Sequence, residues 1–134
     1  MDIKAAMRKK AEAARAASQQ LGVLPTGIKN RALLAMADAL EKRAALILSA
    51  NEQDLEEARQ KGLRRSYLDR LMLNETRIAN MAEGLRQTAA LPDPVCQGDY
   101  STIRPNGLEI RRVRVPIGVI GIIYEARPNV TADA

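Results

Sequence analysis

Residues 117–124 have the sequence Ile-Gly-Val-Ile-Gly-Ile-Ile-Tyr, an almost unbroken apolar run. A run of this length, bounded by Pro116 and by a turn at 125–129, is typical of a strand buried on both faces of a parallel sheet. Residues 130–134 then begin a helix that has hardly started. Because a parallel strand requires a long crossover and a partner strand, we expect an α/β fold of which this chain is a fragment.

The segment before this run predicts an antiparallel β-hairpin. Asn106-Gly107 is a strong turn signal between candidate strands at 100–104 and 108–115. On the second strand the apolar phase shifts across Arg111-Arg112, which predicts a bulge or a twist there. Four arginines lie in or beside this strand pair: Arg104, Arg111, Arg112 and Arg114. Because alternate strand residues face opposite ways, we interpret these arginines as a solvated edge or a subunit contact rather than a phosphate-binding strip.

The part of the chain before Pro92 is expected to be almost entirely helical, because its apolar residues recur with a period near 3.6. Helices are predicted at 2–20, from Thr26 into the forties, from a cap at Asn51 to Lys61-Gly62, at 66–71, and from a cap at Asn74 to the residue before Leu91. The last helix should present one apolar face, made of Ile78, Met81, Ala82, Leu85 and Ala89. We therefore divide the chain into a helical part at 1–92, a linker and hairpin at 93–116 with a candidate role in oligomerisation, and an incomplete sheet segment at 117–134.

Composition excludes several classes of site. Cys96 is the only cysteine and there is no histidine, so an internal disulfide, a Cys/His zinc site and a Ser-His or Cys-His pair are all excluded within this chain. The net charge is +5, but basic and acidic residues are interleaved and only three tyrosines are available for stacking, which disfavours nucleic-acid binding. There is no membrane-length apolar run and no signal-peptide pattern, so we expect a cytoplasmic protein that does not bind membranes.

Residues 111–131 read Arg-Arg-Val-Arg-Val-Pro-Ile-Gly-Val-Ile-Gly-Ile-Ile-Tyr-Glu-Ala-Arg-Pro-Asn-Val-Thr. This block closely resembles the gamma-glutamyl phosphate reductase family, a branch of the aldehyde dehydrogenase superfamily. A general Arg-x-Pro-x-Gly-Val-x-Gly pattern occurs across the superfamily, whereas the turn at 124–130 points to this one branch. Weaker matches lie at residues 29–40, 51–54, 62–63 and 68–71. The resemblance therefore covers essentially the whole chain in order.

The resemblance implies an aldehyde-dehydrogenase-like fold, with a mainly helical amino-terminal layer, a hairpin and the first strand of a Rossmann-like sheet. It also implies an enzyme of proline synthesis that converts L-glutamyl 5-phosphate and NADPH to L-glutamate 5-semialdehyde, NADP and phosphate. In the family the nucleophilic cysteine and most of the cofactor site lie beyond Ala134, so we expect this chain alone to be inactive. A homo-oligomer is expected for the full-length protein, and no metal site is expected.

The turn after the apolar run supplies the candidate site residues. By the resemblance, Asn129 donates to the oxyanion formed at the reacting carbonyl, and the alternative is that Asn129 caps the next helix. Arg127 lies at the carboxyl end of the predicted strand, where it is placed to bind a phosphate or the substrate carboxylate, or else forms an ion pair with Glu125 or a neighbouring segment. Tyr124, Glu125 and Pro128 belong to the same turn and are included as substrate- or cofactor-binding candidates.

Three other residues are given no part in the chemistry. Cys96 has no basic group placed by sequence to activate it, so we predict a bystander thiol. Gly118 and Gly121 do not form a Gly-x-Gly-x-x-Gly fingerprint, and their expected role is close packing of a helix against a strand.

Two alternative functions remain open from the sequence. One is another acyl or aldehyde reductase of the same superfamily, which the turn at 124–130 disfavours. The other is a non-catalytic helical interaction domain, complete at this length, which accounts for the helices but not for the apolar run at 117–124.

Overall fold

The computed structural model describes residues 2–134, which divide into two units: residues 2–26 with 92–121, and residues 27–91 with 122–134. The second unit is helical and contains the candidate site, and the first contains one helix and the hairpin. The helical layer and the antiparallel hairpin therefore agree with the expected fold class. No helix among the described residues is both long enough and apolar enough to cross a membrane.

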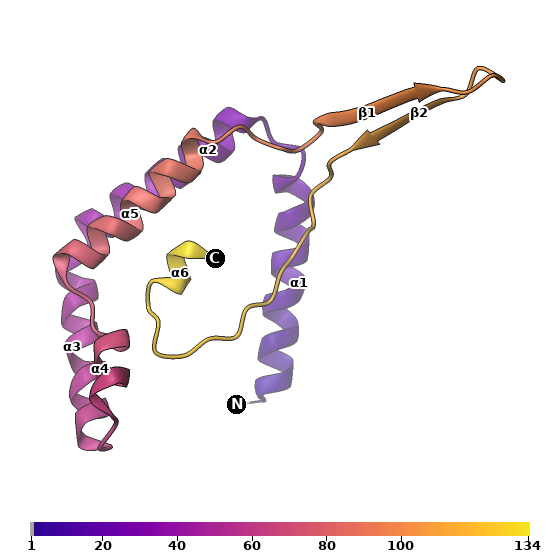
Figure 1. The fold of residues 1–134 in the computed structure, drawn as a ribbon. Coiled ribbons are helices and arrows are strands. Elements are labelled where there is room, and N and C mark those ends of the chain that lie inside the picture. Colours follow the sequence, from indigo (N-terminus) through magenta and orange to yellow (C-terminus); the bar gives the residue numbers. More distant parts are fainter. Residues whose placement is uncertain (1) are drawn as a thin grey trace. The chain divides into compact units, whose positions relative to one another are not determined.

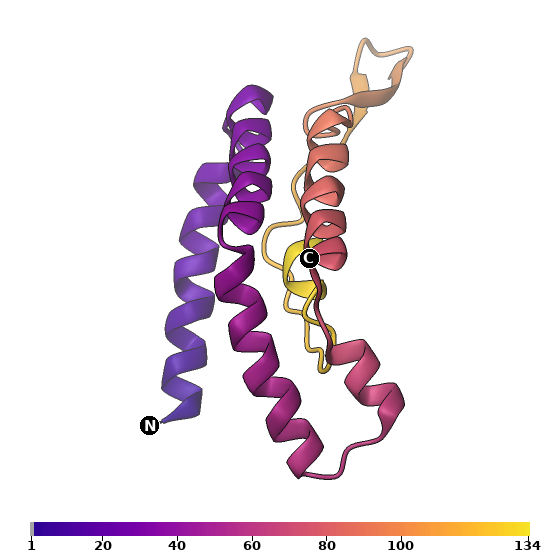
Figure 2. The same cartoon turned by 90° about the vertical axis from the view of Figure 1, so that its left-hand side faces the viewer.

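The second unit is built from five helices: α2 (Thr26–Lys42), α3 (Ala44–Gln60), α4 (Arg65–Leu71), α5 (Glu75–Ala90) and α6 (Val130–Asp133). α4 and α5 both contact α3, and α6 packs on α5. α2 and α5 run side by side (Figures 1 and 2). α5 starts where the sequence predicts, because the Asn74 side chain accepts a hydrogen bond of 2.8 Å from the Arg77 amide.

The core of this unit lies between α2 and α5. Ala37 and Ala82 are completely buried and pack with Leu85, with Leu33 and Leu40 at the edge of the cluster. The predicted apolar face of α5 is confirmed, since all five of its residues are buried and Ile78 is only 1% exposed. Burial of these side chains between α2 and α5 holds the layer together.

An ion-pair cluster joins the same two helices at their rim. Arg86 of α5 donates to the Glu41 carboxylate at 2.6 and 2.8 Å and to Asp38 at 3.3 Å. The hydrogen bond from Arg86 lowers the pKa of Glu41, and the same bond raises the pKa of Arg86. The cluster therefore ties α2 to α5 most firmly when Glu41 is ionised.

The prediction that Asn51 caps a helix is wrong. α3 already begins at Ala44, directly after the break at Arg43 that ends α2, so Asn51 lies inside the helix and is only 5% exposed. Its side-chain amide donates to the Leu71 carbonyl at 2.9 Å and its oxygen accepts from the Leu73 amide at 2.7 Å. Asn51 therefore serves the backbone of a distant segment rather than its own helix end. The predicted helix end at Lys61-Gly62 is confirmed, with Gly62 at φ +68°.

In the first unit, α1 (Ile3–Leu21) starts at Asp2, whose carboxylate accepts from the amides of Lys4 and Ala5. Its predicted extent is confirmed within a residue, and it contributes no buried side chain. Beyond α1, a hydrogen bond of 3.0 Å joins the Thr26 hydroxyl to Asp93.

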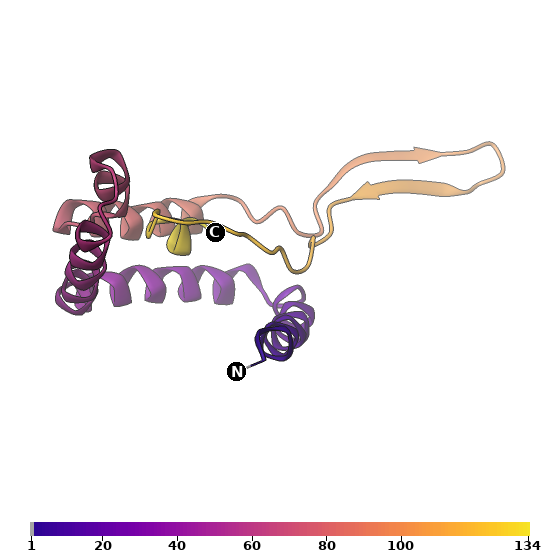
Figure 3. The same cartoon turned by 90° about the horizontal axis from the view of Figure 1, so that it is seen from below.

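The hairpin pairs β1 (Gly98–Ile103) with β2 (Glu109–Val113), as the sequence predicts (Figure 3). Gly107 adopts φ +83°, the left-handed conformation that the turn requires. The predicted irregularity is on the opposite strand from the one expected: Gly98 pairs with Val113 and Tyr100 with Arg112, so the extra residue is Asp99 of β1. Asp99 accepts from Arg112 at 2.7 Å, which gives that arginine a partner at the bulge.

The apolar run at 117–124 is not a strand in the described chain. The only sheet there has two strands, β1 and β2, and offers no third position to this run. Its side chains are therefore exposed, Ile117 by 86% and Ile123 completely. The run forms no strand because a strand takes its backbone hydrogen bonds from neighbouring strands, whereas a helix satisfies its own.

Candidate functional site

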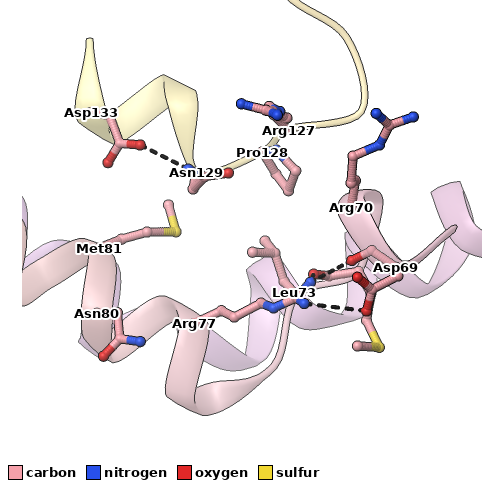
Figure 4. A pocket seen from close by; sticks show the side chains of 11 residues that line it. Asp69, Arg70, Leu73, Arg77, Asn80, Met81, Arg127, Pro128, Asn129 and Asp133 are labelled. Atoms are coloured by element: carbon pink, nitrogen blue, oxygen red, sulfur yellow. Dashed lines mark hydrogen bonds and ion pairs between the residues drawn. The ribbon is translucent and has the colours of Figure 1, made fainter. Parts of the chain in front are cut away.

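A cavity of about 410 Å³ lies in the second unit, between the α4 to α5 connection and the turn that precedes α6 (Figure 4). One wall comes from the end of α4 and the start of α5, and the other from the turn at 127–129 and from α6. The lining residues are Asp69, Arg70, Met72, Leu73, Arg77, Asn80, Met81, Arg127, Pro128, Asn129 and Asp133. The cavity is thus formed by segments that are far apart in the sequence.

Three of the five predicted site residues line this cavity: Arg127, Pro128 and Asn129. Tyr124 and Glu125 do not. The Tyr124 hydroxyl instead forms a hydrogen bond of 2.5 Å with the Thr131 hydroxyl, across the turn that carries the other three. The structure therefore divides the predicted set into a group that faces the cavity and a tyrosine that ties the turn to α6.

Asn129 does not cap α6 with its side chain. It occupies the residue before the helix, but its backbone is helical, with φ −60° and ψ −30°, and its side chain makes no capping hydrogen bond. Capping requires an extended backbone that directs the side-chain oxygen back at the first free amides, so the capping alternative is wrong. The Asn129 amide donates instead to the Asp133 carboxylate at 2.8 Å. An amide carries two N–H groups, and this bond uses one of them.

Arg127 does not pair with Glu125, so that alternative is also wrong. Among the described residues, the Arg127 guanidinium makes no ion pair or hydrogen bond, and the side chain is exposed on the cavity rim. An arginine without a partner at the edge of a cavity is available to an anion from outside the chain.

The cavity contains two further arginines, Arg70 and Arg77, that the sequence reasoning did not single out. Arg77 donates to the carbonyls of Asp69 and Met72, at 2.5 Å each, and lies 3.4 Å from the Asp69 carboxylate. These carbonyls belong to the carboxyl end of α4, whose last carbonyls have no partner within the helix. Arg77 is therefore a structural clamp on the α4 to α5 connection.

Arg70 has no such role. Its side chain is exposed and makes no ion pair or hydrogen bond within residues 2–134. The stretch Leu68-Asp69-Arg70-Leu71 contributes to the family resemblance, and that match was the one signal in the sequence that pointed to it. Periodicity gives no such signal, because an exposed arginine on a short helix is ordinary.

Asn51 supports the same wall from behind. Its two hydrogen bonds hold Leu71 and Leu73, the residues on either side of Met72, and both Met72 and Leu73 line the cavity. The Asn51 amide and the Arg77 guanidinium thus fix the backbone of the connection from two directions. A buried polar group that satisfies two backbone groups is costly to remove.

A second cavity of about 420 Å³ in this unit is apolar and carries no comparable cluster of charges. It is lined by Met36, Ala39, Leu40, Arg43, Leu46, Ile47, Met81, Leu85, Thr131 and Ala132. Nowhere in the described part of the chain do three acidic or cysteine side chains gather in an arrangement suited to a metal ion. The polar cavity with the three arginines is therefore the candidate site.

The remaining candidates belong to the first unit. Cys96 is an exposed free thiol with φ +65°, and its amide donates to the Arg114 carbonyl at 2.9 Å. Gly118 and Gly121 were expected to permit close packing, but a β-carbon at either position would meet no atom within 4 Å. That packing prediction is wrong for the described chain, because the run at 117–124 has no neighbour to pack against.

The chain is similar along its whole length to known proteins. It is 57% identical over 134 residues to the gamma-glutamyl phosphate reductase of Moorella thermoacetica, and 57% identical over 125 residues to that of Caldanaerobacter subterraneus. These matches cover 100% and 93% of this chain but only 32% and 30% of the relatives, so the chain spans about a third of their length. No family model matches the sequence.

Two solved structures agree with the sequence matches. The gamma-glutamyl phosphate reductase of Thermotoga maritima superposes with a TM-score of 0.88 at 46% identity, over 92% of this chain and 30% of that one. The enzyme of the same name from Saccharomyces cerevisiae gives 0.83 at 32% identity, over 92% and 31% of the two chains. Sequence and fold comparisons thus select the same group of proteins.

Proposed function

We propose that this chain belongs to the gamma-glutamyl phosphate reductase family and supplies part of the substrate site of such a reductase, because it is 57% identical over its whole length to one protein of that name. The proposed reaction converts L-glutamyl 5-phosphate, NADPH and a proton to L-glutamate 5-semialdehyde, NADP and phosphate, a step of proline synthesis. The observation that carries the proposal is the polar cavity, in which Arg127 and Asn129 of the family-specific turn lie together.

Each of these two residues has a chemical role in the proposal. The free N–H of Asn129 donates to the oxyanion that develops when a nucleophile attacks the acyl carbonyl, and a neutral amide does this without exchanging a proton. Asp133 holds the other N–H and thereby orients the amide. Arg127 binds an anionic group of the substrate, while Pro128 shapes the wall between the two. No role is assigned to Glu125, and Tyr124 holds the turn through Thr131.

Two parts of the chemistry are not assigned to these residues. The nucleophile is proposed to be a cysteine thiolate outside this chain, as the family resemblance implies. NADPH is the proposed reductant, but the described residues do not fit a dinucleotide site by themselves. Gly118 and Gly121 make no Gly-x-Gly-x-x-Gly turn, and α6 has only four residues. No cofactor step is therefore assigned to them.

We also propose a homo-oligomeric, cytoplasmic enzyme, with the hairpin as an oligomerisation element. The support is that its apolar side chains are uncovered in the first unit, including Ile103 at 72% and Val115 at 72% exposure. The helical interaction domain is disfavoured, because the relatives that match at least 93% of the chain carry a reductase name. Another acyl reductase of the superfamily is disfavoured for the same reason.

A chimaeric enzyme tests the proposed function. This chain replaces the matching third of the Moorella thermoacetica reductase, and the reaction is run in reverse, from semialdehyde to acyl phosphate. We expect reduction of NADP that requires both glutamate semialdehyde and inorganic phosphate. The unaltered Moorella thermoacetica enzyme is the control. A chimaera that oxidises simple aldehydes equally well without phosphate would contradict the acyl-phosphate assignment.

A further inference from the structure

We infer that Arg70 acts together with Arg127 at the rim of the polar cavity, and that the two arginines bind an anionic group of the substrate, either a phosphate or a carboxylate. The inference rests on the proposed function and adds a residue that the family-specific turn does not contain. It follows from the way the charges around this cavity are paired and unpaired.

Five charged side chains line the cavity: Asp69, Arg70, Arg77, Arg127 and Asp133. Both carboxylates are engaged, because Asp69 lies 3.4 Å from the Arg77 guanidinium and Asp133 accepts from the Asn129 amide at 2.8 Å. Arg77 is engaged as well, through its bonds to the end of α4. Within the described chain, Arg70 and Arg127 make no ion pair, and the three arginines and two carboxylates leave the lining with one positive charge in excess.

Arg70 lies on the wall that also carries Arg77, and Arg127 lies on the other wall, with the turn and α6 (Figure 4). Arg70 projects from α4 and Arg127 from the turn before α6, so an anion bound by both joins the two walls of the site. Like charges that share a small cavity repel, and an anion bound between them relieves that repulsion. The guanidinium fork also matches the geometry of carboxylate and phosphate oxygens better than an ammonium group does.

Asn51 and Arg77 preorganise the backbone that carries Arg70. The carboxyl end of α4, which carries Arg70, is held by the Arg77 bonds to Asp69 and Met72 and by the Asn51 bond to Leu71. Arg70 therefore extends from a fixed backbone, which reduces the entropy lost when its side chain binds a ligand.

The proposed substrate carries two groups of suitable chemistry, the phosphoryl group at one end and the α-carboxylate at the other. The reverse reaction separates them, because phosphate and the semialdehyde are then independent substrates. A rise in KM for phosphate identifies the phosphoryl group as the ligand of Arg70, and a rise in KM for the semialdehyde identifies the carboxylate.

The kinetic test compares Arg70→Gln with Arg65→Gln in the active chimaera. Arg65 is an exposed arginine on the same helix that does not line this cavity. Loss of a charge-assisted contact predicts a KM raised about 10- to 100-fold for one of the two substrates, with kcat and the KM for NADP little changed. Arg70→Lys should recover part of the loss, since it keeps the charge but not the fork.

A binding test does not depend on catalysis. Inorganic phosphate and, separately, L-glutamate are titrated into the 134-residue chain at low ionic strength, with the backbone amide signals followed by NMR. Saturable shifts at residues 69–73 and 127–129 are expected in the wild type and in Arg65→Gln, and their loss in Arg70→Gln.

The outcomes separate this inference from the proposed function. If the chimaera is inactive but Arg70→Gln abolishes anion binding, the proposed function fails and the anion site stands. If the chimaera is active and Arg70→Gln behaves like Arg65→Gln in both tests, the inference is overturned. An effect of Arg70→Gln confined to the KM for NADP would also overturn it, because the arginine would then serve the cofactor phosphate.

Discussion

Replacing Asn51 by alanine should destabilise the helical unit, because this one side chain satisfies two backbone groups of the α4 to α5 connection. Asn51 is only 5% exposed and its bonds to Leu71 and Leu73 are 2.9 and 2.7 Å long. A net contribution of about 1 to 1.5 kcal/mol for each bond predicts a loss of about 2 to 3 kcal/mol. Leu71 and Leu73 are half-buried, so water can replace part of the lost hydrogen bonding. The loss of unfolding free energy should therefore not exceed about 3 kcal/mol.

Urea unfolding, followed by circular dichroism, measures the loss in the free energy of unfolding. The slope of that free energy against urea concentration should be the same in wild type and variant, because a different slope would indicate a changed unfolded state. Asn80→Ala is the matched control: Asn80 lines the cavity from α5 but is exposed and makes no hydrogen bond within the described residues. It should change the free energy of unfolding by no more than about 0.5 kcal/mol.

Hydrogen exchange provides the local readout. In the Asn51→Ala variant the Leu73 amide should lose its protection, since its only acceptor among the described residues is the Asn51 oxygen. Amides in the middle of α5 should exchange through global unfolding and report the same loss as urea. A variant that unfolds within about 0.5 kcal/mol of the wild type, with the Leu73 amide still protected, would refute the reasoning.

Two further predictions concern the site and the ion-pair cluster. Asn129→Ala in the active chimaera should lower kcat by roughly 10²- to 10³-fold with little change in the KM for NADP, and steady-state kinetics on a variant with an unchanged circular dichroism spectrum check this; a near-normal kcat would exclude the oxyanion role. Because the folded-state pKa of Glu41 lies below its ordinary value of 4.5, the Arg86 pair should stabilise the chain above that pH and lose its effect as the pH falls through the lower, folded-state pKa. The difference in urea midpoint between wild type and Arg86→Gln should therefore shrink as the pH falls below 4.5, and this decrease should be smaller in high salt. A difference that grew on acidification would contradict the pairing of Glu41 with Arg86.

Local patterns predicted the helical layer well. The spacing of apolar residues identified the buried face of α5, and Asn74 before that spacing identified its cap. Both are decided by residues within a few positions of one another, since helix hydrogen bonds and caps are local. The hairpin belongs to the same class, because its turn residues and its strands are adjacent in sequence.

Predictions that depended on a distant segment failed or remained incomplete. Asn51 has the residue type of a cap, and nothing nearby in sequence shows that its amide is required by Leu71 and Leu73. Asn129 presents the same ambiguity, and a helical backbone together with Asp133 decides against capping. Asparagine suits both uses because it carries a donor and an acceptor on a short side chain, so its role is set by what lies beside it in space.

The site itself was half predictable for the same reason. Arg127 and Asn129 could be found because they follow an apolar run in a specific turn, whereas Arg70 emerges only when the turn and the end of α4 form opposite walls of one cavity. Each arginine alone has an ordinary explanation as a solvated side chain. Together they make no ion pair within the described chain, and the three arginines and two carboxylates of the lining have one positive charge in excess. Such an excess favours the binding of an anion, and an anionic substrate is what the turn at 124–130 independently leads us to expect.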